Sequence, residues 1–281
     1  MVIRDLNIKI EGTNKRPILI DLMYSSSIES APLIIFCHGY KGFKDWGAWP
    51  LLSTTLAASG FAVLKFNFSH NGGTYKQPID FPDLEAFGNN NYTKELEDLD
   101  RVISWTQTNH SKNSNINPLN ITLIGHSRGG GIVVLKAAED SRVRKVVSLA
   151  GVSDFKSRFP VGVELKNWKE TGVRFVENGR TKQQMPHYYQ FYKDFITNES
   201  RLTIQTAVKK LKSPLLIIHG DADTSVSTNE ALALHSWSPN SQLVVIEGAN
   251  HVFGSSHPWI LSELPPYFHQ ILTKITHFIN N

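Results

Sequence analysis

Residues 121-ITLIGHSRGGGIVVLKAA-138 start as an apolar run, turn at Gly-His-Ser-Arg-Gly and continue as a second apolar segment. This order predicts a strand, a sharp turn and a helix, with Ser127 at the apex. Such a turn strains the backbone of its central residue and points the side chain out over the sheet edge, where an activated nucleophile belongs. Gly125 and Gly129 would let the strand and the helix approach each other. The alternative is a glycine-rich connection that merely exposes a serine.

The composition is that of an ordinary globular protein. The 281 residues are 41% hydrophobic and 19% charged, so the chain can bury a large core as one enlarged domain. Cys37, within 33-LIIFC-37, is the only cysteine, which excludes an internal disulfide framework and suits a reducing compartment. We expect Cys37 to be a buried core residue.

The chain carries no recognisable export or membrane signal. The segment 1-MVIRDLNIKIEG-12 alternates like a strand and carries charge, and no run approaches the roughly 20 apolar residues of a membrane-spanning helix. There is no lipidation motif at either end. We therefore expect a soluble, cytoplasmic protein without stable membrane association.

The positive charge is concentrated in one segment. The formal charge is +4, yet residues 156–212 alone hold twelve Lys or Arg against five Asp or Glu. These charges are scattered among aromatic residues and match no nucleic-acid-binding motif, so we expect no nucleic-acid partner. A solvated face that favours anionic ligands is the simpler interpretation. The sequence does not decide between a monomer and a homodimer.

The apolar periodicity predicts an α/β fold. Expected strands are 3–11, 17–24, 33–37, 61–68, 120–124, 143–150, 214–220 and 242–248. Expected helices are 47–59, 93–109, the segment after Ser127, 227–236 and 267–280. This alternation implies right-handed crossovers and a mostly parallel, twisted sheet with helices on both faces, whose active residues lie at the carboxyl ends of the strands.

One interval is too long for a simple loop. More than sixty residues separate the strand ending near Ala150 from the strand beginning at Pro214, so this part must contain structure of its own. We interpret 156–212 as an inserted cap on a core domain formed by 1–155 and 213–281. Its aromatic residues either face substrate or pack the small core of the cap itself. The candidates for substrate contact are Trp168, Tyr188, Tyr189 and Tyr192.

Two further segments supply candidate partners for Ser127. Attack by a serine hydroxyl needs a base to take its proton and an acid to orient that base. After Ser127 come 219-HGDADTSV-226 and 248-GANHVF-253, each at the end of a predicted strand. We identify Asp223 as the acid and His251 as the base.

These motifs together resemble the α/β-hydrolase superfamily. The resemblance rests on 38-HGYKG-42, 125-GHSRGG-130, 219-HGDADTSV-226 and 250-NH-251, and it spans nearly the whole chain. It implies an α/β-hydrolase fold, the acid at Asp223 rather than at Asp221 or Asp154, and an oxyanion hole formed by the backbone N–H groups of Tyr40 and Arg128. The length of the insert and the HGY sequence are similar to the cinnamoyl and feruloyl esterase-like branch.

The sequence contains no motif for a metal, phosphate or dinucleotide site. No metal-ligand spacing, phosphate-binding loop or dinucleotide fingerprint occurs, so we expect neither a metal nor a cofactor. His38, His126 and His219 lie next to glycines at predicted strand ends. There a histidine can hydrogen-bond the loop backbone, so we expect structural roles for all three.

The resulting hypothesis is a serine hydrolase that cleaves a small-molecule carboxylic ester, with an aryl or cinnamoyl-type ester as one candidate. A peptidase, an amidase or a thioesterase could use the same three residues. An alternative of another class is a non-catalytic ligand-binding module on a hydrolase fold. No strongly amphipathic lid helix, as an interfacial lipase would need, stands out in 156–212.

Overall fold

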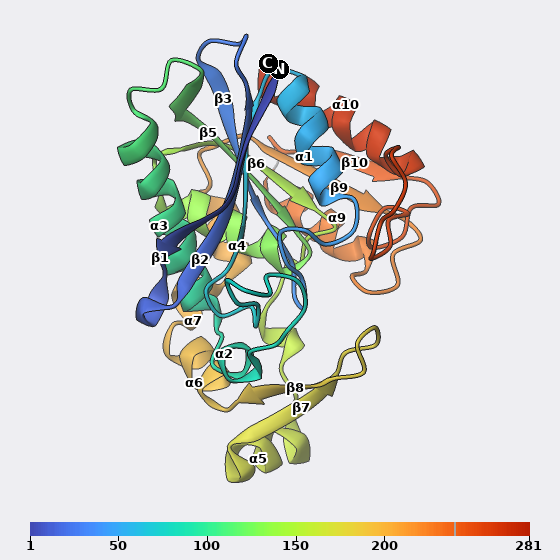
Figure 1. Cartoon of the computed structure of the whole chain (residues 1–281). Helices are drawn as coiled ribbons and strands as arrows, with labels where there is room; N and C mark the ends of the chain where they lie inside the picture. Colours follow the sequence, from blue (N-terminus) through green and yellow to red (C-terminus); the bar gives the residue numbers. More distant parts are fainter. Residues whose placement is uncertain (239) are drawn as a thin grey trace.

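An eight-stranded sheet forms the centre of the molecule (Figure 1). The structure is a computed structural model that describes residues 1–238 and 240–281. The strand order is β1-β2-β4-β3-β5-β6-β9-β10, and β2 alone runs in the opposite direction to the other seven strands. The strands are β1 (Val2–Glu11), β2 (Pro17–Ser25), β3 (Ala31–Cys37), β4 (Ala62–Asn67), β5 (Ile116–His126), β6 (Val143–Leu149), β9 (Leu215–Gly220) and β10 (Gln242–Ile246). The mostly parallel sheet predicted from the sequence is confirmed.

Helices cover both faces of this sheet. On one face lie α1 (Trp49–Ala58) and α10 (Pro266–Asn280), and on the other lie α3 (Tyr92–His110), α4 (Arg128–Glu139) and α9 (Thr228–Trp237). The apolar face of α3 packs on the sheet, because Leu96, Leu99, Val102 and Ile103 are all fully buried. Cys37 is also fully buried, as expected. Burial from both sides explains why the central strands are continuous apolar runs.

The connections contain elements that the periodicity did not indicate. The short helix α2 (Leu84–Gly88) lies between β4 and α3, and the Asp83 side chain caps it by accepting a hydrogen bond from Ala86 N. A single 3₁₀ turn, η1 (Thr13–Lys15), joins β1 to β2. Strand β5 begins at Ile116 rather than at 120, because Ile116 and Asn117 pair with Ala31 and Pro32. Short elements of this kind depend on long-range pairing and capping more than on local periodicity.

Residues 150–214, here called the β6–β9 segment, have structure of their own, as their length predicts. The segment contains η2 (Lys156–Arg158), α5 (Gly162–Thr171), β7 (Val173–Glu177), β8 (Gln184–Tyr188), α6 (Gln190–Thr197), α7 (Glu199–Leu202) and α8 (Ile204–Lys210). Strands β7 and β8 form an antiparallel hairpin, which lies with α5 below the main sheet in Figure 1. Helix α8 instead packs against α4 and α9 in the helical layer. The limits 156 and 212 of a cap stay a prediction.

The chain termini lie side by side at the opposite end of the molecule from the β7–β8 hairpin (Figure 1). No helix in the described part of the chain is both long and apolar enough to cross a membrane.

Candidate active site

Ser127 occupies a strained turn between β5 and α4. Its backbone angles are φ 57° and ψ −119°, a region that strongly favours glycine. Three hydrogen bonds hold it there: Ser127 N donates to Leu149 O at 2.9 Å, and Ser127 O accepts from Gly130 N at 3.0 Å and from Val152 N at 3.2 Å. Strain of this kind persists only where the surroundings impose it, and it is characteristic of functional sites.

The glycines around Ser127 are required by close backbone contacts. A Cβ atom on Gly125 would lie 2.1 Å from Gly129 O, and one on Gly129 would lie 2.5 Å from Cys37 O. A Cβ atom on Gly39 would lie 2.9 Å from the Cβ of Ser127. Strand β5, helix α4 and the loop after β3 therefore meet at the serine because none of the three glycines has a side chain.

His251 and Asp223 form a hydrogen-bonded pair beside this turn. They follow β10 and β9, two parallel neighbours whose carboxyl ends meet at the same edge of the sheet. His251 Nδ1 donates to Asp223 Oδ2 at 2.7 Å, and Asp223 Oδ1 accepts from the N–H groups of Ser225 and Val226 at 2.8 and 2.9 Å. The Asp223 side chain has no exposed surface, whereas that of His251 is 20% exposed.

The environment of Asp223 keeps its carboxylate ionised. Burial alone would raise the pKa of Asp223, but hydrogen bonds from His219, His251 and the Val226 N–H outweigh burial and hold the pKa well below its usual range. An ionised carboxylate at this position accepts a hydrogen bond from His251 Nδ1, which turns Nε2 of the same ring away from Asp223.

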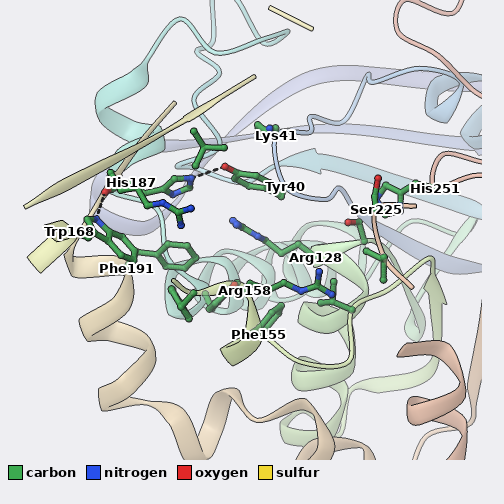
Figure 2. A pocket seen from close by; sticks show the side chains of 17 residues that line it. Tyr40, Lys41, Arg128, Phe155, Arg158, Trp168, His187, Phe191, Ser225 and His251 are labelled. Atoms are coloured by element: carbon green, nitrogen blue, oxygen red, sulfur yellow. Dashed lines mark hydrogen bonds between the residues drawn. The ribbon is translucent and has the colours of Figure 1, made fainter. Parts of the chain in front are cut away.

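His251 and Ser127 are brought to one cavity through His126. The rings of His126 and His251 lie 4.8 Å apart, and His126 Nε2 donates to His251 O at 2.8 Å. Ser127 and His251 both line the cavity shown in Figure 2. Among the described residues, no hydrogen bond joins the Ser127 hydroxyl to His251. Such contacts are often loose without a ligand and tighten when substrate binds.

The backbone N–H groups of Tyr40 and Arg128 are free to bind an anion. Within the described chain, neither group donates a hydrogen bond to a protein acceptor, and both residues line the cavity. The Tyr40 loop is held by two bonds to Gly39 O, from Gly42 N at 3.1 Å and from His38 Nδ1 at 2.9 Å. The Arg128 N–H group also lies at the N-terminus of α4, where the helix dipole attracts an anion.

His38, His126 and His219 each bond to loop backbone, as predicted. His38 contacts Gly39 O, and His219 Nε2 contacts Val226 O at 2.9 Å. Burial lowers the pKa of His38 to about 4 and that of His126 to about 3, so both are neutral at pH 7.

The two other carboxylates considered in the sequence bond elsewhere. Asp221 accepts from Gly248 N at 2.7 Å, and Asp154 accepts from Lys156 N at 2.8 Å.

The cavity has a volume of about 530 Å³ and an aromatic wall. That wall is formed by Tyr92, Phe155, Phe159, Trp168 and Phe191. Trp168 is the one predicted substrate-contact residue that lines the cavity. Its Nε1 donates to His187 O at 2.7 Å, which fixes the indole against β8 (Figure 2).

Three of the predicted substrate-contact residues are not among those that line this cavity. Tyr188 packs on Gly88 and hydrogen-bonds to Glu85. Tyr189 and Tyr192 pack against Trp168, with ring centroids 5.8 and 6.3 Å away, and so support the wall from behind. The alternative interpretation, that aromatic rings of the insert pack its own core, is therefore correct for Tyr189 and Tyr192.

Several lining residues were missed in the sequence. Tyr92 comes from α3, outside the insert, and stacks on Phe155 with ring centroids 3.8 Å apart. The Tyr40 hydroxyl and His187 Nε2 share a 2.7 Å hydrogen bond across the cavity. The side chain of Arg128 also enters the cavity, although only its backbone was considered. No local pattern marks any of these residues, because tertiary packing alone brings them together.

Comparison with known proteins identifies the fold independently. The model of the alpha/beta hydrolase family matches residues 34–259. A putative hydrolase from Agrobacterium vitis S4 is 20% identical with a TM-score of 0.73, covering 99% of both chains. The ferulic acid complex of Est1E from Butyrivibrio proteoclasticus is 19% identical with a TM-score of 0.72, covering 97% of both chains.

A curated relative matches only part of the chain. An uncharacterized 31.7 kDa protein of the traX-finO intergenic region of Escherichia coli is 32% identical over 123 residues. The match covers 44% of this chain and 38% of that relative. The family model covers most of the chain, and the structural likeness extends over its whole length. This protein therefore belongs to the alpha/beta hydrolase family.

Proposed function

We propose that the protein is a serine hydrolase that cleaves carboxylic esters through an acyl-enzyme. The observation that carries this proposal is the 2.7 Å bond between His251 Nδ1 and a fully buried Asp223, beside a serine on a strained turn that opens into the same cavity. Ligand binding alone provides no reason to place these three residue types at three separate strand ends.

The proposed reaction has two halves. His251 Nε2 takes the proton from Ser127 Oγ as the oxygen attacks the ester carbonyl, and returns that proton to the leaving alcohol when the tetrahedral intermediate collapses. Water then attacks the acyl-enzyme with the same base, which releases the acid and restores the serine. Asp223 holds the imidazole in the required tautomer and balances its positive charge.

The N–H groups of Tyr40 and Arg128 stabilise the developing oxyanion. Both are unpaired with protein acceptors among the described residues and line the cavity beside Ser127. Loss of one preorganised donor in a site of this kind typically costs about 3 to 4 kcal/mol of transition-state stabilisation. The bonds to Gly39 O, which shape the 38–42 loop, therefore contribute to catalysis by positioning Tyr40.

An aryl ester is the substrate that the cavity favours. The five rings of its wall can stack on an aromatic acyl or alcohol group, with offset or edge-to-face contacts. One structural neighbour, Est1E from Butyrivibrio proteoclasticus, is described with ferulic acid, an aromatic acid, bound, which is consistent with this preference. Amides and thioesters use the same nucleophile and base, so kinetics must separate them from esters.

A substitution of the nucleophile tests the proposal. Ser127→Ala should abolish hydrolysis of p-nitrophenyl butyrate without unfolding the protein, and a fluorophosphonate probe should label the parent protein at Ser127. Ser236→Ala, which removes an exposed hydroxyl on α9, is the matched control and should keep full activity. Near-normal turnover by Ser127→Ala would exclude the mechanism.

A panel of matched ester, thioester and amide substrates then separates the activities. We expect kcat/KM to be highest for the esters. A folded protein that remains unlabelled and binds esters without cleaving them would favour the non-catalytic module.

A further inference from the structure

The cavity beside Ser127 has a strongly one-sided charge. Four of its 17 lining residues carry a positive charge and none is Asp or Glu. The four cations are Lys41, Arg128, Arg158 and Arg174. An excess of one sign in a low-dielectric cleft selects ligands of the opposite sign and accelerates their capture.

Arg128 has donors that the protein does not use. Its guanidinium lies over the rings of Tyr40, Tyr92 and Phe191, 4.4, 5.3 and 5.4 Å from their centroids, and its side chain is only 14% exposed. Of five N–H donors, one makes a hydrogen bond, a long 3.3 Å contact to Glu95 Oε1, within the described chain. The other donors can meet an acceptor on a bound molecule.

Two of the cations have no carboxylate partner. Arg128 is paired with Glu95, and Arg158 is paired with Glu230. Among the described residues, neither Lys41 nor Arg174 forms an ion pair; Lys41 Nζ donates a 3.2 Å hydrogen bond to the carbonyl of Glu177 and lies over the Tyr40 ring. The cavity therefore keeps an uncompensated positive charge.

Three of the four cations lie around one place, the Tyr40–His187 pair. Burial lowers the pKa of His187 to about 3, and the charges of Arg128, Arg174 and Lys41 act in the same direction. Lys41 Nζ and Arg128 Cζ lie 5.1 and 4.4 Å from the centroid of the Tyr40 ring, and Arg174 pairs with His187 between β7 and β8. Lys41, Arg128 and Arg174 are here called the cationic cluster. Figure 2 shows the Arg128 side chain extending away from His251 toward Tyr40 and His187.

We propose that this site takes esters that carry a carboxylate, with the carboxylate bound at the cationic cluster and the ester carbonyl at Ser127. The inference rests on the proposed function and names its substrate class. A planar carboxylate can accept two parallel hydrogen bonds from a guanidinium, and the aromatic rings that surround Arg128 fit an aryl spacer between the two groups.

Two matched pairs of neutral and anionic esters test the inference. Monomethyl terephthalate and methyl 4-carbamoylbenzoate differ only by a carboxylate or a carboxamide on the acyl part. 4-Acetoxybenzoate and 4-acetoxybenzamide differ in the same way on the alcohol part. We expect kcat/KM to be at least tenfold higher for the carboxylate in one pair, and that pair shows which part of the substrate faces the cluster.

Substitutions in the cationic cluster test whether it causes the preference for carboxylate-bearing esters. Arg174→Gln and Lys41→Gln should each reduce the carboxylate-to-carboxamide ratio severalfold, and the double variant should bring it near one. Lys166→Gln, which removes an exposed charge on α5, is the matched control and should leave the ratio unchanged. Added salt should also lower the ratio, because it screens the attraction.

The outcomes separate this inference from the proposed function. Equal kcat/KM within both pairs, in a protein that hydrolyses them through Ser127, would overturn the carboxylate preference and leave the hydrolase intact. If no ester is cleaved, isothermal titration calorimetry of the Ser127→Ala protein still tests the carboxylate preference, because it compares the binding of the two esters in each pair. The anionic member must then bind at least tenfold more tightly than the amide, and equal dissociation constants would overturn the inference.

Discussion

The backbone of Ser127 is held where a side chain is unfavourable. Residues in such conformations cost about 1 to 3 kcal/mol each, which the three hydrogen bonds around Ser127 and the contacts of β5 and α4 must offset. This conformation places Ser127 in the lining of the cavity.

This strain predicts that removal of the side chain stabilises the protein. Ser127→Gly and Ser127→Ala should both be inactive, but the glycine variant should be more stable than the alanine variant by about 1 kcal/mol, because only alanine keeps the Cβ atom. Urea denaturation of the two variants measures the difference. Equal midpoints with equal slopes would show that the turn stores no strain.

Asp223 permits a second prediction at the residue scale. Asp223→Asn keeps the size of the side chain but removes the charge that fixes the His251 tautomer, so we expect kcat to fall by about 10⁴-fold with the fold retained. Steady-state kinetics measure the fall in kcat, and circular dichroism checks that the fold is retained. A loss of less than tenfold would show that His251 does not depend on this carboxylate.

At the scale of elements, the distance between β5 and α4 decides whether the site forms. The two elements approach so closely that a methyl group at Gly125 would overlap Gly129 O, a backbone atom that cannot turn aside. The same packing brings the loop after β3 over Ser127 and so places Tyr40 beside it.

Gly125→Ala should therefore damage both stability and activity. The strand and the helix must separate to admit the methyl group, and overpacking of this kind typically costs about 1 to 3 kcal/mol. Gly179→Ala is the matched control, because nothing lies within 4 Å of a Cβ atom there. Thermal unfolding and ester hydrolysis measure both variants, and a Gly125→Ala protein as stable and active as the control would contradict the packing argument.

At the scale of the whole molecule, buried neutral histidines couple stability to pH. Burial lowers the pKa values of His38 and His70 to about 4 and those of His126 and His187 to about 3. In the unfolded chain a histidine titrates near 6.5, so between about 4 and 6.5 the unfolded state binds more protons. The free energy of unfolding should therefore be highest above pH 6.5 and fall as the pH drops through that window.

His70 offers a test away from the candidate site. Its ring bonds to the Ser69 hydroxyl at 2.7 Å, and asparagine can keep a polar contact there without titrating. His70→Asn should reduce the slope of unfolding free energy against pH, between pH 4.5 and 6, by up to about 1.4 kcal/mol per pH unit. Urea denaturation over this range measures the slope, and an unchanged slope would mean that His70 is not neutral in the folded protein.

Much of this architecture can be predicted from the sequence. Apolar periodicity separates strands from helices, because each must bury one face, and the glycines around Ser127 mark a turn that tolerates no side chains. The order of the strand ends that carry Ser127, Asp223 and His251 predicts that they meet, since parallel strands end at one edge of a sheet. The hydrogen bond between Asp223 and His251 agrees with that expectation.

The lining of the cavity was decided by tertiary packing alone. Tyr188, Tyr189 and Tyr192 have the composition of a binding surface, yet they face Gly88 or the back of Trp168. Tyr92, from a helix outside the insert, faces the cavity instead. Side-chain direction in a short insert depends on which neighbours it packs against, and those contacts join residues far apart in sequence. Periodicity describes only local burial, so it cannot distinguish a ring that faces substrate from one that supports it.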